Sequence, residues 1–117
     1  MIVTEVEGPW NIETMLRWGQ EFETFAIELC KAGPIGAVSQ FHNSILTSPE
    51  SLQLLRKMAT YSIKHHRLAV TALVIAPDVE GHLLAQSIFK NVYDGLLPFQ
   101  IFDRMDAGTA FARDFLA

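Results

Sequence analysis

The feature that most constrains this chain is an uninterrupted apolar run at residues 68–76, with the sequence LAVTALVIA. Because its residues do not alternate between apolar and polar, a strand formed here is buried on both faces. Strands of that kind lie in the middle of parallel sheets that helices cover on both sides. Pro77 ends the run, since proline cannot donate to a β-ladder. The run is too short to span a membrane, which takes about 20 residues.

Strand and helix patterns alternate along the rest of the chain. Strands are predicted at 2–7, 35–41, 68–76 and 98–102, and an amphipathic helix follows each of them. Right-handed crossovers make all four strands parallel and place helices on both faces. The predicted fold class is therefore α/β, with a four-stranded, mainly parallel sheet. A chain of 117 residues corresponds to one domain, 1–117.

Four polar residues are predicted to cap these helices: Asn11, Ser48, Asp78 and Asp103. Short polar side chains at that position accept a hydrogen bond from the first turn of the helix. The basic run at 64–67, Lys-His-His-Arg, is predicted to close the second helix and to face water, where cations meet the negative end of the helix dipole.

Composition excludes several classes of protein. Half of the residues are apolar and 19% are charged, which excludes a disordered chain. A net charge of −4 argues against nucleic acid as the main partner. The single cysteine, Cys30, allows neither an internal disulfide nor a thiolate metal site, so a reduced, cytoplasmic setting is expected. Acidic residues and Pro9 interrupt the N-terminal segment, which does not read as a signal peptide.

No motif points to catalysis, a metal or a cofactor. His65 and His66 are adjacent on a helix and diverge, so they cannot bind one metal together. A histidine, a serine and two aspartates could form a hydrolytic triad, but Ser44 lacks the glycine elbow of such nucleophiles. Helix capping is the simpler explanation for Asp78 and Asp103. We therefore expect a protein without enzymatic activity and without a cofactor.

The carboxyl ends of the predicted strands are the one place where polar side chains from distant segments should converge, and ligands of parallel sheets bind there. The candidate residues for binding a ligand or partner are Trp10, His42, Asn43, Ser44, Asp78 and Arg104. For Trp10, a role in the core or in locking the turn is favoured over lining a pocket.

Three segments resemble the SpoIIAA-like (STAS-like) family of small bacterial proteins. They are the turn Gly8-Pro9-Trp10-Asn11, the buried run LAVTALVIAP and the C-terminal LLPFQIFDRMDAGTAF. The resemblance implies a mainly parallel sheet flanked by helices and no demonstrated enzymatic activity. Many members begin with an extra strand for which this chain has little room, so an open sheet edge is expected to invite pairing with another chain.

Phosphorylated members of the wider STAS group carry an Asp-Ser-Ser-Gly-Leu-Gly-like turn at the start of the second helix. The region 46–52 here reads LTSPESL, which keeps a serine but lacks the aspartate and the glycines. Ser48 is thus a possible phosphosite that the motif does not support. The favoured function is a protein-interaction module, with a second copy of the chain as partner. The alternative is a sensor of an apolar or nucleotide-like small molecule at the strand ends.

Overall fold

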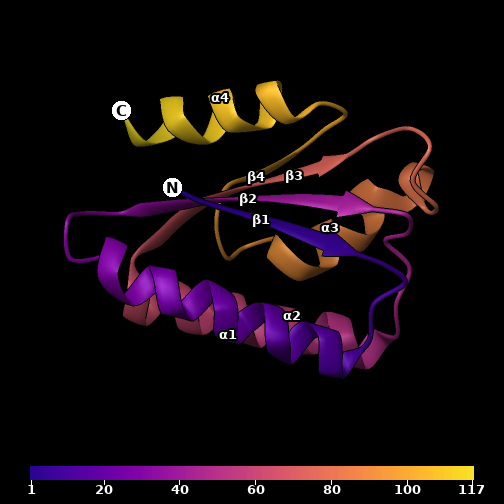
Figure 1. The fold of residues 1–117 in the computed structure, drawn as a ribbon, viewed down its shortest axis with the longest axis horizontal. Coiled ribbons are helices and arrows are strands. Elements are labelled where there is room, and N and C mark those ends of the chain that lie inside the picture. Colours follow the sequence, from indigo (N-terminus) through magenta and orange to yellow (C-terminus); the bar gives the residue numbers. More distant parts are fainter.

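The apolar run forms a strand in the interior of the sheet. The computed structural model describes all residues 1–117 and places β3 (Leu68–Ile75) between β2 (Ile35–His42) and β4 (Phe99–Phe102). β1 (Ile2–Glu7) pairs with the other side of β2, so the strand order is β1-β2-β3-β4, with every pair parallel (Figure 1). Seven of the eight residues of β3 are buried. The prediction of a parallel sheet around this run is confirmed.

Helices cover both faces of the sheet, as predicted. α1 (Ile12–Leu29), α2 (Pro49–His66) and α3 (Ala85–Tyr93) lie on one face, and α4 (Met105–Leu116) lies on the other (Figure 1). When each strand joins the sheet beside the previous one, right-handed crossovers place every connecting helix on the same side. Only the helix after the last strand is free to cover the second face. No helix combines the length and apolar character needed to cross a membrane.

β3 contributes buried side chains to clusters on both faces of the sheet. Leu73 and Ile75 pack under α1–α3 with the aromatic rings of Phe41 and Phe89. On the α4 side the cluster consists of Val38, Val70, Ala72, Val74 and Ala112. Successive residues of a strand point to opposite faces, so a strand with a cluster on each side must be apolar throughout. This double burial explains the absence of alternation in the run.

The sequence signals at the starts of α1 and α2 are confirmed. The Asn11 side chain accepts a hydrogen bond from the Thr14 backbone N–H, at 2.8 Å. Ser48 caps α2 in the same way by accepting from the Ser51 N–H, and proline occupies the first helical position.

The predicted caps at Asp78 and Asp103 are wrong. After β3 the chain is held by an isolated bridge between Glu80 and Ser44, so the short 3₁₀ helix η1 (His82–Leu84) and then α3 begin well after Asp78. At α4 the N-cap position is Arg104, without a side-chain bond to the helix. The Asp103 carboxylate instead lies 3.1 Å from Nε2 of His82. Contacts between distant segments, which the local sequence does not reveal, keep both aspartates away from the N-cap positions of the helices.

The prediction that the basic run 64–67 faces water is wrong at one residue. His66 is buried, and its Nε2 lies 3.4 Å from Oε1 of Glu23 on α1. Because α1 packs against α2, the last turn of α2 is partly covered. On α1 the apolar residues extend beyond the buried face, and Ile12, Phe25 and Leu29 are exposed.

We expect Leu73→Ala to lower the free energy of unfolding by about 2–5 kcal/mol, because it leaves a cavity in a strand packed on both faces. The same change at Leu83, which is 94% exposed, should alter stability by no more than about 0.5 kcal/mol. Urea unfolding of both variants measures the difference. Equal effects would contradict the interior position of β3.

Candidate functional site

The carboxyl ends of β1 and β2 and the segment after β3 meet at one end of the sheet. The backbone N–H of Gly8 donates to the His42 carbonyl. Two more backbone hydrogen bonds join the segments that follow β2 and β3: the Ile45 N–H donates to the Glu80 carbonyl, and the Glu80 N–H donates to the Asn43 carbonyl. We call the six predicted binding residues and the loops that carry them the strand-end rim. Two side chains of this rim, Asn43 and Ser44, hold the loops to one another.

Asn43 and Ser44 connect the rim loops most directly. Asn43 adopts the left-handed conformation, with φ 69°, and its side-chain amide donates to the Gly8 carbonyl at 2.6 Å. Ser44 is 1% exposed; its hydroxyl donates to Oε1 of Glu80 at 2.7 Å and accepts from the Leu46 N–H at 3.1 Å. Sequence reasoning missed Glu80, because nothing local links it to a serine that lies 36 residues earlier.

The other polar residues of the rim lie on the surface, and two of them pair with a carboxylate close by. His42 Nε2 is 3.1 Å from a Glu5 carboxylate oxygen on the adjacent strand. Arg104 pairs with Asp106 two residues later, at 2.6 Å, and Asp78 is exposed. The Ser44 hydroxyl is bonded to a carboxylate rather than to a histidine. The rim residues therefore do not form the serine–histidine relay of a hydrolase.

Trp10 lies in the core beneath the rim. It is buried, and its ring centroid is 6.4 Å from that of Phe41. The hydroxyl of Thr47 donates to the Trp10 carbonyl, which joins the first turn to the segment before α2. The indole Nε1 is buried without a hydrogen-bond partner. The side chain thus packs the core, and its backbone holds the turn.

Ser48 is exposed at the start of α2, where its hydroxyl accepts from the Ser51 N–H and also bonds the Ser51 hydroxyl at 3.1 Å. Ser48 therefore caps α2, and its side chain lies on the surface.

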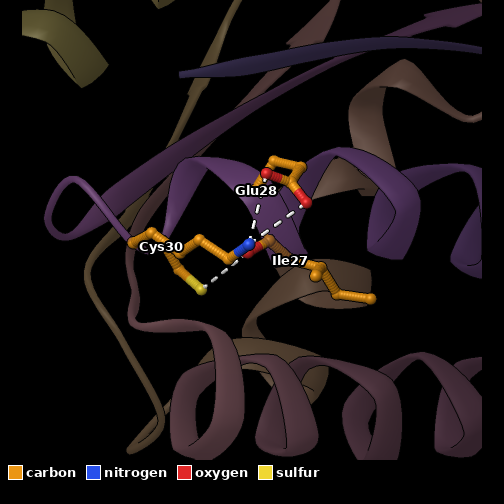
Figure 2. Close-up of polar contacts among 4 residues, drawn as sticks. Ile27, Glu28 and Cys30 are labelled. Carbon is orange, nitrogen blue, oxygen red and sulfur yellow. Dashed lines mark hydrogen bonds and ion pairs between the residues drawn. The ribbon is translucent and has the colours of Figure 1, made fainter.

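Cys30 follows the last turn of α1, and its thiol is engaged locally. Figure 2 shows Sγ directed at the Ile27 carbonyl of the same helix, 3.4 Å away. The neighbouring Lys31 ammonium reaches the Glu28 carboxylate at 3.3 Å. Arg67 donates to the backbone carbonyl of Cys30 rather than to its sulfur. The thiol has no basic group in hydrogen-bond contact that would activate it as a nucleophile.

A cavity of about 230 Å³ lies between α1, α2 and the sheet, away from the strand-end rim. Its lining residues come from β2, β3 and the three helices on that face, and none of the six rim residues is among them. Sequence reasoning missed this site. The available signal was a pair of small residues, Ala37 and Ser39, two positions apart on one face of the strand.

Tyr93 of α3 also borders the cavity. Burial disfavours the charged phenolate, so the pKa of Tyr93 is raised well above its ordinary value. Its hydroxyl is therefore neutral throughout the physiological range and can both donate and accept a hydrogen bond.

No protein-family model, curated protein or solved structure matches this chain.

We expect Ser44→Ala to lower the free energy of unfolding by about 1–3 kcal/mol, because it leaves the Glu80 carboxylate and the Leu46 N–H without their shared partner. Ser87→Ala, on the exposed side of α3, is the matched control and should be nearly neutral. Thermal unfolding of both variants compares them. If Ser44→Ala matched the control, the rim loops would not depend on this contact.

Proposed function

We propose that this chain is a non-enzymatic regulatory module of the SpoIIAA-like (STAS-like) kind that works by binding protein and pairs first with a second copy of itself. The observation that carries the proposal is β1, which has a hydrogen-bonded neighbour on one side only. A strand at a sheet edge presents unpaired N–H and C=O groups that another strand can bind. The segments that resemble the family support the same assignment.

The surroundings of β1 favour association. Val3 on the strand is 49% exposed, and Phe25 on the helix that packs beside it is 61% exposed. β1 carries no proline or bulge, two of the usual means of protecting an edge strand. A six-residue strand with apolar side chains beside it can therefore accept another strand.

A two-fold axis makes the two copies pair antiparallel, with the same residues used by both. If the axis passes through Thr4, Val3 of each copy faces Glu5 of the other, and no two carboxylates are directly opposed. Direct opposition of like charges destabilises a strand pair, and this register avoids it.

We place the module in the cytoplasm, because its single cysteine, Cys30, is a free thiol. A second candidate function is small-molecule sensing, which the cavity beneath α1 and α2 favours.

The register gives a charge test of the dimer. Val3→Glu places a carboxylate opposite Glu5 of the other copy and should give a monomer, whereas Val3→Lys should remain a dimer. Leu83→Glu introduces the same charge away from β1 and should also remain a dimer. Sedimentation equilibrium distinguishes these states. A wild-type monomer at high concentration, or a dimeric Val3→Glu variant, would refute pairing through β1.

A further inference from the structure

The floor of the cavity beneath α1 and α2 is made of small side chains. Ala37 on β2 lies beside Thr71 on β3 in the strand register, and Ser39 is the next β2 residue on that face. Beyond them on the same face lie Phe41 and Leu73, which fill the core. The cavity thus lies over Ala37, Ser39 and Thr71, whose side chains are smaller than those of Phe41 and Leu73.

The walls are mainly apolar and leave room for a ring-sized molecule. They are formed mainly by Leu16, Trp18 and Phe22 of α1 and by Leu55, Met58 and Ala59 of α2. An apolar cavity of about 150 Å³ is enough to bind benzene. The 230 Å³ here is larger and can hold a substituted ring. Leu16 and Tyr61, which line it from the two helices, are each about half exposed, so the gap between α1 and α2 leads to solvent.

Three buried hydroxyls border this space. Ser39 accepts a hydrogen bond from Thr4 at 3.3 Å, which leaves its own proton free to donate. The hydroxyls of Thr71 and Tyr93 have no hydrogen-bond partner within the chain, although both residues are more than nine-tenths buried. Buried hydroxyls in native proteins are almost always bonded to protein, water or ligand. The hydroxyls of Thr71 and Tyr93 are therefore available to bond a polar group inside the cavity.

The charges around the cavity exclude an anion. No lysine or arginine lines it, and the buried imidazole of His66 is already next to the Glu23 carboxylate. A carboxylate or phosphate placed here would be buried without a cation, which is strongly unfavourable. Tyr93 is itself neutral, since burial raises its pKa.

From the small floor, the apolar walls and the unpartnered hydroxyls, we infer that this cavity binds an uncharged, ring-sized aromatic molecule that carries one hydrogen-bonding group, such as a phenol or an indole. The flat ring contacts Trp18, Phe22 and Leu55, and its polar group bonds the hydroxyls of Thr71 and Tyr93. The site has no residue from β1, so it stands whether or not two copies pair through that strand.

Calorimetric titration of the full chain with toluene and two of its para-substituted derivatives tests this. 4-Methylphenol should bind with one molecule per chain, toluene more weakly, and 4-methylbenzoate not at all. Thr71→Val keeps the shape of the side chain but removes its hydroxyl. It should weaken 4-methylphenol binding about fivefold, the effect of one lost neutral hydrogen bond, and leave toluene binding unchanged.

A second variant and a spectroscopic signal locate the site. Ala59→Leu fills the cavity and should abolish binding of both neutral probes, with circular dichroism confirming that the variant is folded. In the wild-type protein, 4-methylphenol should shift the NMR signal of the Trp18 indole N–H more than that of Trp10, which does not line the cavity. Absence of binding up to the solubility limit, or binding that neither variant changes, would overturn the inference and leave a packing void.

Discussion

The structure depends on the burial of β3 from both sides. Its side chains alternate between the aromatic cluster under α1–α3 and the valine-rich cluster under α4, so either helix layer alone would leave half of the strand in water. Close approach of α4 requires small residues at its contact points. A Cβ added at Gly108 would lie 2.7 Å from Cγ2 of Val74, which explains a glycine within a helix where alanine is otherwise preferred.

The same arrangement determines where binding sites can form. At the carboxyl ends of the strands, Asn43 and Ser44 hold the loops together, whereas His42, Asp78 and Arg104 lie on the surface. Beneath α1 and α2 the sheet instead carries small residues, and three hydroxyls border the open space. Hydrogen bonds within the chain thus hold the loops at the strand ends, whereas the face of the sheet beneath α1 and α2 retains a cavity.

Sequence alone predicted the features that arise from local patterns. The double burial of β3, the strand and helix order, and the caps at Asn11 and Ser48 follow from periodicity and from contacts within one helical turn. The errors at Asp78 and Asp103 arise from contacts between distant segments, namely the Glu80–Ser44 bridge and the His82 pair. The cavity escaped prediction for a related reason, because it depends on which small residues of β2 and β3 become neighbours and on what α1 and α2 place above them.

Residue-resolved hydrogen exchange under native conditions tests the central claim most directly, because amides exchange slowly where opening requires the core to be exposed. If β3 is buried between two helix layers, the slowest amides lie in β2 and β3, and those of the edge strands β1 and β4 exchange faster. Amides of β3 that exchanged as fast as those of β1 would contradict the account, because a strand buried between two helix layers cannot open as readily as an edge strand.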